Sequence, residues 1–158
     1  GIDISQGMID VGRIGTRNAP GAARLEFVRA DALDIPFVKE FDVAVCFGAL
    51  GHFLPDDQPR FVEQVHRSLR PGGRLILLTS YSPPWSSRRY WAARAFNAAM
   101  HIRNWLIPPP FVMYYLTFLL PSAADLLSDR GFDVHIQERV FTDPWEAACL
   151  VIARRKDE

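Results

Sequence analysis

The chain has 158 residues, of which 49% are hydrophobic, so a single domain with a sizeable core is expected. Its 18 basic and 18 acidic residues balance to a net charge of zero, which argues against a general affinity for nucleic acid. Cys46 and Cys149 lie in apolar runs and are expected to be buried thiols of a reducing, cytoplasmic compartment.

Strand and helix patterns alternate through residues 1–80. Residues 1–4 resemble the end of a strand, and Ser5 can cap a helix that runs to about Thr16. The inner side of this helix is expected to hold Met8, Ile9 and Val11. A second strand is predicted over residues 25–30.

The run from Phe41 to Phe47 gives the strongest strand signal. Because it is almost entirely apolar, it predicts a parallel strand covered on both faces. It ends in Gly48–Gly51, where small residues allow a ligand to approach the backbone closely. Open α/β sheets bind ligands at the carboxyl ends of such strands, so we expect the site here.

A helix is predicted from Pro55, with an apolar side that includes Phe61, Val62, Val65 and Leu69. The turn Arg70–Gly73 should end it, and a strand should follow over residues 74–79. This order implies parallel crossovers. It predicts an α/β fold with a doubly wound, mostly parallel, Rossmann-like sheet and helices on both faces.

Residues 81–120 interrupt this pattern with an aromatic-rich insertion. From Gln64 through Ala124 there is no acidic residue, but there are seven arginines. The apolar run 111–120 is too short to cross a membrane and is expected to be a buried or surface-lying helix. Beyond it, Ser122–Asp125 matches a capping box for a short helix. Strands over 133–141 and 146–154 should form an antiparallel pair at the sheet edge.

Three short motifs occur together in the strand–helix part of the chain. They are GIDIS at residues 1–5, ADALDIPF at 30–37 and LRPGG at 69–73. In combination they resemble the class I S-adenosylmethionine-dependent methyltransferases. The resemblance covers residues 1 to about 80 well and 121–154 loosely. It implies S-adenosylmethionine as cofactor and methyl transfer to a small-molecule acceptor.

The resemblance also assigns roles to individual residues. Asp3, at the end of the first strand, would accept hydrogen bonds from both ribose hydroxyls, and Asp31 would accept one from the adenine amino group. The alternative without a ligand is that both acids are solvated loop residues or helix caps. The implied cofactor contacts are Asp3, Ile4 and Met8, then Asp31, Ala32 and Leu33, then Phe47 and Gly48.

One expected part of this family's domain is not in the sequence. The family's first strand and its Gly-rich loop would lie before Gly1, so we expect residues 1–158 to be a single incomplete methyltransferase domain. The absent strand would sit between the strand ending at Ile4 and the strand at 41–47. Residues 81–120 would form a helical, lid-like insertion within this domain.

His52 is the candidate general base, because it lies in the loop after the strand at 41–47 and an imidazole titrates near neutrality. Alternatively, His52 only orders that loop. No metal site is expected, because the four histidines show no ligand spacing.

The composition of the insertion indicates which class of acceptor the protein binds. Its predicted substrate contacts are Tyr81, Trp85, Tyr90 and Trp91. A basic, aromatic lid suits a hydrophobic or anionic acceptor, such as a lipid, quinone or aromatic acid, and leaves peripheral membrane contact open. The competing interpretation is that its helical stripe, which includes Trp91, only packs an ordinary lid.

Three other functions compete with methyl transfer to a small molecule. A nicotinamide-dependent oxidoreductase could share the ribose acid and the sheet, but the short-chain type needs Tyr followed four residues later by Lys, and Tyr90 is followed by Arg94. A non-catalytic, methyltransferase-like binding module or inactive fragment remains open. A nucleic-acid methyltransferase is disfavoured by the neutral charge and by the lack of a base-gripping Asn-Pro-Pro-Tyr-type motif.

Overall fold

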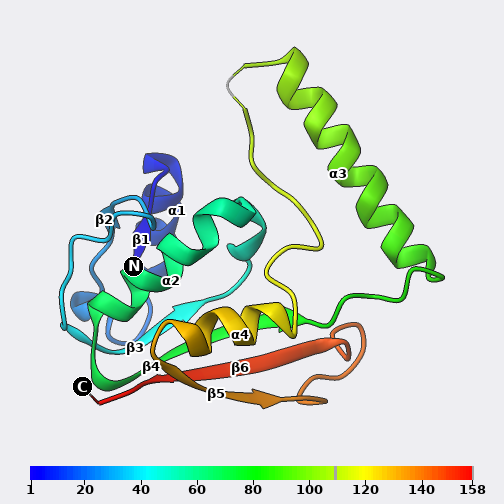
Figure 1. Ribbon diagram of the computed structural model, residues 1–158. Helices are drawn as coiled ribbons and strands as arrows, with labels where there is room; N and C mark the ends of the chain where they lie inside the picture. Colours follow the sequence, from blue (N-terminus) through cyan, green and yellow to red (C-terminus); the bar gives the residue numbers. More distant parts are fainter. Residues whose placement is uncertain (109, 158) are drawn as a thin grey trace.

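The computed structural model describes residues 1–108 and 110–157 and contains two separate sheets (Figure 1). In the smaller sheet, β1 (Ile2–Asp3) pairs in parallel with β2 (Val28–Arg29). The larger sheet has the order β3-β4-β6-β5. Its strands are β3 (Phe41–Cys46), β4 (Leu69–Ser80), β6 (Ala148–Arg155) and β5 (Phe132–Gln137). β3 and β4 run parallel, whereas β4–β6 and β5–β6 are antiparallel, which confirms the expected α/β class and the antiparallel C-terminal pair.

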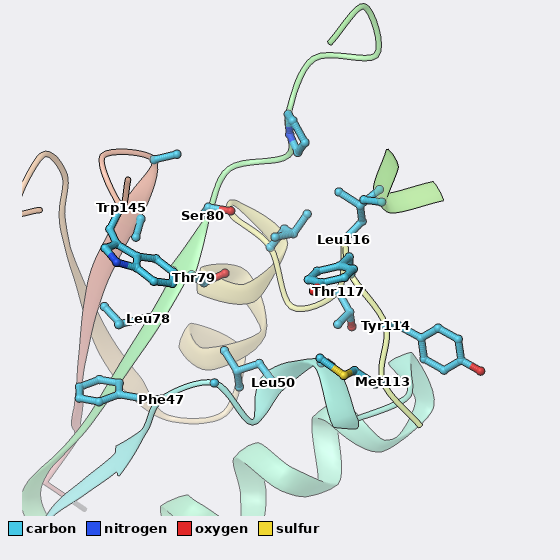
Figure 2. A pocket seen from close by; sticks show the side chains of 18 of the residues that line it. Phe47, Leu50, Leu78, Thr79, Ser80, Met113, Tyr114, Leu116, Thr117 and Trp145 are labelled. Carbon is cyan, nitrogen blue, oxygen red and sulfur yellow. The ribbon is translucent and has the colours of Figure 1, made fainter. Parts of the chain in front are cut away.

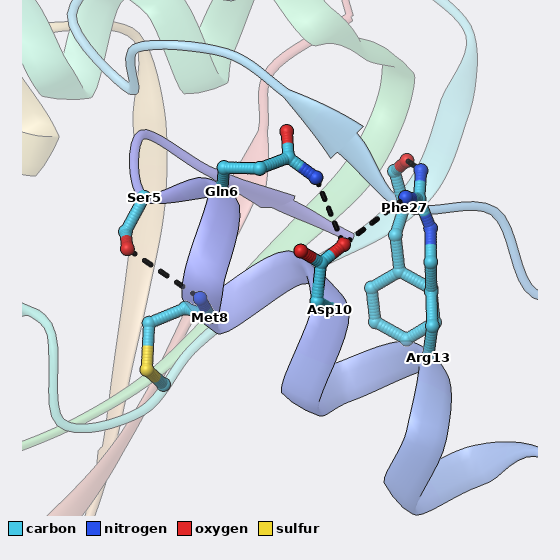
Figure 3. A network of polar contacts seen from close by, with 6 residues as sticks. All are labelled: Ser5, Gln6, Met8, Asp10, Arg13 and Phe27. Carbon is cyan, nitrogen blue, oxygen red and sulfur yellow. Dashed lines mark hydrogen bonds and ion pairs between the residues drawn. The ribbon is translucent and has the colours of Figure 1, made fainter.

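The helix α1 (Gln6–Thr16) packs on the small sheet. As predicted, Ser5 caps it, and the Ser5 hydroxyl accepts a hydrogen bond from the Met8 amide at 3.4 Å (Figure 3). Ile9 is buried, but Met8 and Val11 are exposed, so the predicted inner side was wrong for these two residues. The physical reason is that the two short strands cover only a narrow strip of the helix. Figure 3 also shows the Arg13 guanidinium reaching Phe27, to whose carbonyl oxygen it donates at 3.0 Å.

The core lies between the larger sheet and two helices that cover one of its faces, α2 (Gln58–Ser68) and α4 (Ser122–Asp129) (Figure 1). A 3₁₀ turn over Pro55–Asp57 leads into α2. The predicted apolar side of this helix is confirmed as the centre of the core, in which Phe61, Val62, Val65 and Leu69 are buried.

The opposite face of β3 is open. The Val43, Val45 and Phe47 side chains are 50%, 58% and 56% exposed, so the expectation of a strand covered on both faces was wrong. Within residues 1–108 and 110–157, β3 pairs with β4 alone, and no strand lies on its other edge. This face of β3 stays exposed because α2 and α4 both pack on the other side of the sheet.

The segment Arg70–Gly73 does not separate α2 from β4 but forms an irregularity within β4. The pairing jumps from Phe41–Leu69 to Val43–Arg74, so extra residues of β4 loop out of the ladder. Gly72 takes a φ of 71°, which favours glycine. The predicted turn chemistry is therefore correct, although the strand begins earlier than expected.

The cap of α4 differs from the prediction. The N-cap is Pro121 and its carbonyl oxygen accepts from the Ala124 and Asp125 amides, at 2.8 and 3.2 Å. Ser122 is therefore already inside the first turn and makes no capping hydrogen bond, so the predicted capping box was wrong.

The insertion contains one long helix, α3 (Arg88–Leu106), which stands off from the rest of the molecule (Figure 1). Its base is closed by a bridge between Tyr81 and Leu120 and by a hydrogen bond from the Leu120 amide to the Ser80 carbonyl at 3.0 Å. Residues 111–120 form an irregular segment without a helix, in which Leu116 and Phe118 take positive φ values of 59° and 52°, so the expected helix was wrong. No helix among the described residues is long and apolar enough to cross a membrane.

Side chains of α3 explain why the first part of this segment is not helical. The Asn104 amide nitrogen donates to the Phe111 carbonyl at 3.0 Å, and the Asn104 oxygen accepts from the Phe111 amide at 2.8 Å. Asn97 makes the same pair of hydrogen bonds with Tyr115, at 2.7 and 2.8 Å. These bonds satisfy backbone groups that a helix would have paired internally.

Candidate functional site

Two carboxylates lie at the carboxyl ends of the adjacent parallel strands β1 and β2. One oxygen of Asp3 accepts from the Ser5 amide at 2.8 Å, and one oxygen of Asp31 accepts from the Leu33 amide at 2.8 Å. These bonds fix the direction of both carboxylates. Among the described residues, no group bonds to the second oxygen of either one, so each can accept a hydrogen bond from a ligand hydroxyl or amino group.

Apolar side chains stand beside these acids. Ile4 and Met8 are exposed, while Ala32 and Leu33 are half-buried. Exposed apolar surface next to two carboxylates suits a ligand with a flat apolar ring and polar edges. The residues present therefore fit the ribose and adenine of S-adenosylmethionine.

A pocket of about 750 Å³ opens where β3 and β4 end (Figure 2). Its floor includes Phe47 and Gly48 after β3, and 78–80 at the end of β4. Its other walls come from residues 113–117 of the insertion and from Trp145. Gly48 has a φ of 77°, a conformation that lets the chain turn sharply away from the strand. The lining is mainly apolar, which suits a hydrophobic ligand.

The loop after β3 holds the insertion over this pocket. The Tyr114 amide donates to the Gly51 carbonyl at 2.8 Å, and Nδ1 of His52 lies 2.6 Å from the Val112 carbonyl oxygen. Since a carbonyl can only accept, Nδ1 carries the proton in this bond, and in the neutral ring Nε2 is then the unprotonated nitrogen. His52 lines the pocket and therefore has a nitrogen that can take a proton there.

The four predicted substrate contacts are not among the described residues that line this pocket. Trp85 and Trp91 are exposed, and Tyr90 contacts the Trp91 ring edge-on at a centroid distance of 5.5 Å. The Tyr81 hydroxyl donates to the Glu138 carboxylate at 2.8 Å, and this hydrogen bond raises the Tyr81 pKa. The insertion lines the pocket with other residues: Pro83, Ala93, Met113, Tyr114, Tyr115, Leu116, Thr117 and Leu119.

Sequence reasoning missed these pocket residues because it treated 111–120 as a helix. The one available signal was the run Pro108–Pro110 before this segment, which disfavours a helix there. Pro109 itself lies outside the described residues. Trp145, between the two predicted C-terminal strands, was not singled out, although it lines the pocket near the end of β4 (Figure 2).

The cysteines do not offer a nucleophile. Burial raises the pKa of the Cys46 thiol to about 11, and a backbone hydrogen bond involving Ala49 offsets only part of this. Burial also raises the pKa of Cys149. Both thiols therefore stay protonated near neutral pH. Within 1–108 and 110–157, no group of three His, Cys, Asp or Glu side chains could hold a metal ion.

The strand order and these sites define a class of protein. Carboxylates at the ends of adjacent parallel strands, followed by a glycine turn and a pocket after β3, are typical of doubly wound α/β proteins that bind a nucleoside-containing cofactor. Solved structures support the fold. A SAM-dependent methyltransferase from Methanosarcina mazei matches all of this chain and 82% of its own, with a TM-score of 0.69 at 21% identity. The CMeT domain of the citrinin polyketide synthase matches 99% of this chain and 38% of its own, with a TM-score of 0.66 at 19% identity.

Sequence comparisons find similarity to methyltransferases. Residues 1–73 match the family model described as "Methyltransferase domain". A demethylmenaquinone methyltransferase of Clavibacter sepedonicus is 39% identical over 84 residues, covering 52% of this chain and 32% of the relative. The ubiquinone/menaquinone biosynthesis C-methyltransferase UbiE of Pseudomonas putida is 36% identical over 141 residues, covering 83% of this chain and 54% of the relative. The chain thus spans only about a third to a half of these two relatives. Over that span it is similar to S-adenosylmethionine-dependent methyltransferases, and the family-model match supports a class I methyltransferase.

Proposed function

We propose that this protein transfers a methyl group from S-adenosylmethionine to a hydrophobic small-molecule acceptor. The observation that carries the proposal is the position of the apolar pocket, which begins at Phe47 and Gly48. These two residues are also the expected contacts of the cofactor's methionine part. An acceptor in the pocket therefore lies next to the methyl donor, as in-line displacement requires.

The cofactor supplies an electrophilic methyl group on a sulfonium, and the chain's own residues bind and orient it. Asp3 and Asp31 would hold the ribose and the adenine through their second carboxylate oxygens. Ile4, Met8 and Leu33 would cover the faces of the adenine. These assignments rest on the family resemblance and on the free oxygen of each acid.

The acceptor class is supported by two observations. The pocket walls are mostly aliphatic and aromatic, and the relatives named above are said to methylate demethylmenaquinone or to act in ubiquinone and menaquinone biosynthesis. A quinol with an apolar tail fits both. Tyr81, Trp85, Tyr90 and Trp91 remain predicted substrate contacts only for an acceptor that extends beyond the pocket.

His52 is proposed as the general base for an acceptor that must lose a proton. Its Nδ1–H bond to the Val112 carbonyl leaves Nε2 unprotonated in the neutral ring, and His52 lines the pocket. In His52→Asn the amide nitrogen can still donate to that carbonyl, but no base remains. In His52→Ala both functions are lost.

The two histidine variants separate the base role from the loop-ordering role. If His52 is the base, His52→Asn and His52→Ala both lower kcat by roughly 10²–10⁴-fold. If it only orders the loop, His52→Asn keeps near-normal kcat and only His52→Ala loses activity. The assay is radiolabelled methyl transfer to demethylmenaquinone.

The open edges of β1 and β3 support a further part of the proposal, that residues 1–158 are an incomplete domain. Each strand has one partner among the described residues, and Val43, Val45 and Ile4 are exposed beside the unpaired edges. One more parallel strand between β1 and β3 would pair both edges and cover these side chains. We expect that strand and the Gly-rich loop to come from a segment before Gly1.

Calorimetric titration tests the cofactor site. S-adenosylmethionine and its demethylated product are titrated into this chain and into a form extended upstream. We expect binding to the extended form, lost in Asp3→Ala and kept in Asp10→Ala, the matched control on the exposed side of α1. If a folded extended form binds neither compound, the proposal is wrong, and the non-catalytic binding module becomes the favoured function. Hydride transfer with a nicotinamide cofactor would instead establish the oxidoreductase.

A further inference from the structure

The helix α3 is held by one side only. Asn97 and Asn104, seven residues apart, face residues 111–115 and make the four backbone hydrogen bonds described above. The Phe96 ring contacts Tyr115 at a centroid distance of 4.9 Å, and the His101 ring stacks on Tyr114 at 4.7 Å. These contacts fix which side of the helix points outward.

The outward side is an apolar stripe at helical spacing, formed by Trp91, Ala95, Ala98, Ile102 and Trp105. All five are exposed, with Trp91 at 60% and Trp105 at 83%. No residue of α3 is buried, and the helix projects away from the sheet (Figure 1). A continuous apolar stripe of this size in water is typical of an interaction surface rather than of a packed lid.

The charges around the stripe all have one sign. Arg88 and Arg94 lie about 60° to either side of Trp91 on the helix, and both are exposed. Among the described residues, neither Arg88 nor Arg94 takes part in an ion pair, and the nearest acids in sequence are Glu63 and Asp125. Although the whole chain is neutral, this surface is cationic.

We propose that the outer stripe of α3 docks on an anionic lipid surface. Arginines on the flanks of an apolar stripe can extend to lipid head groups while their methylene groups stay with the apolar part, and tryptophan prefers the same depth. The opposite side of α3 does not need to be polar and solvated, because residues 111–115 already cover it. The helix lies on the surface without crossing it, in keeping with its length and polarity.

A second copy of the chain fits the stripe less well. In a symmetric dimer the same patch faces itself, so the flanking arginines of two copies would approach each other without acids to neutralise them. Anionic lipid neutralises them directly. The positive charge beside the stripe therefore favours anionic lipid over a second copy of the chain.

Docking through α3 would bring the pocket close to the lipid surface. Ala93, on the inner side of α3, lines the pocket, so one helix separates the pocket from the proposed lipid surface. An apolar acceptor dissolved in the bilayer would need to pass only this helix. The docking itself does not depend on methyl transfer.

Vesicle co-sedimentation of the chain tests the docking without any cofactor. Vesicles of phosphatidylcholine are compared with vesicles that also contain phosphatidylglycerol. We expect binding to the anionic vesicles only, weakened by added salt and reduced about fivefold by either Arg88→Gln or Arg94→Gln. Trp91→Ala combined with Trp105→Ala should reduce it further. Ile14→Ala, on the exposed side of α1, and Arg17→Gln, at the exposed residue that follows it, are the matched controls and should have no effect.

Tryptophan fluorescence provides a second readout on the unaltered chain. Three of the four tryptophans, Trp85, Trp91 and Trp105, lie in the insertion, so brominated anionic lipid should quench most of the emission. Three results would each overturn the proposal: equal binding to neutral vesicles, no binding to either kind, or self-association that is lost in Trp105→Ala while vesicles are not bound. The last result would assign the stripe to a second copy.

Discussion

The contact between Gly51 and Tyr114 gives the sharpest test of how the insertion is held. A Cβ added at Gly51 would lie 2.8 Å from the Tyr114 carbonyl oxygen, far inside ordinary contact distance. The obstruction is backbone, so Gly51→Ala must push residues 112–115 outward. That shift breaks the Tyr114–Gly51 hydrogen bond and strains the neighbouring bond from His52 to Val112.

The expected size follows from these two bonds. Each is worth about 1 kcal/mol net, so local opening of the insertion becomes easier by about 2 kcal/mol, or roughly 30-fold. Hydrogen exchange at the Tyr114 amide should accelerate by that factor. Gly15→Ala is the control, because a Cβ there meets nothing within 4 Å. It should stabilise α1 by about 1 kcal/mol and leave Tyr114 unchanged. Unaltered Tyr114 exchange in Gly51→Ala would refute the reasoning.

Three further predictions concern stability and reactivity. Arg155→Ala removes the guanidinium that donates at 2.8 and 2.6 Å to two carbonyls where α2 ends. It should lower the free energy of unfolding in urea by about 2–3 kcal/mol. The control Arg154→Ala, at the exposed neighbour, should lower it by less than about 0.5 kcal/mol. Thr79→Val removes the hydroxyl that donates at 2.6 Å to the insertion, and should cost about 1 kcal/mol by the same measurement. Alkylation of Cys46 should be about 100-fold slower at pH 8 than for a thiol of pKa 9.0, and should rise tenfold per pH unit up to about pH 11. Peptide mass spectrometry measures the alkylation rate of Cys46. A rate that stops rising near pH 9 would contradict the raised pKa.

Local sequence patterns located the elements well because their causes are local. Ser5 caps α1 through its own hydroxyl, and the apolar spacing of α2 requires one buried side. The motif at residues 1–5 occurs at a strand end, as predicted, whereas the motif at 69–73, predicted as a turn after the helix, forms an irregularity inside β4.

The failures concern features that distant partners decide. The composition of β3 suggests burial on both faces, but its exposure depends on whether another strand and helix cover it. Residues 111–120 have helix-compatible composition, yet Asn97 and Asn104 bond to the backbone of Phe111 and Tyr115 from across the insertion and keep this part non-helical. Neither asparagine has a sequence signature that predicts this role, so most of the pocket wall could not be found from the sequence.

The base of the insertion has an evolutionary consequence. The chain leaves the sheet at Tyr81 and returns at Leu120, and these two residues are bridged to each other. Residues 82–116 can therefore change in length and composition while β4, β6 and the helix α4 keep their positions, whereas Phe118 belongs to the buried core and must stay. Acceptor choice and surface attachment can diverge in this segment while the part of the chain that holds the two acids stays the same. A chimaera that replaces residues 82–116 with a short glycine linker should accordingly keep the sheet folded.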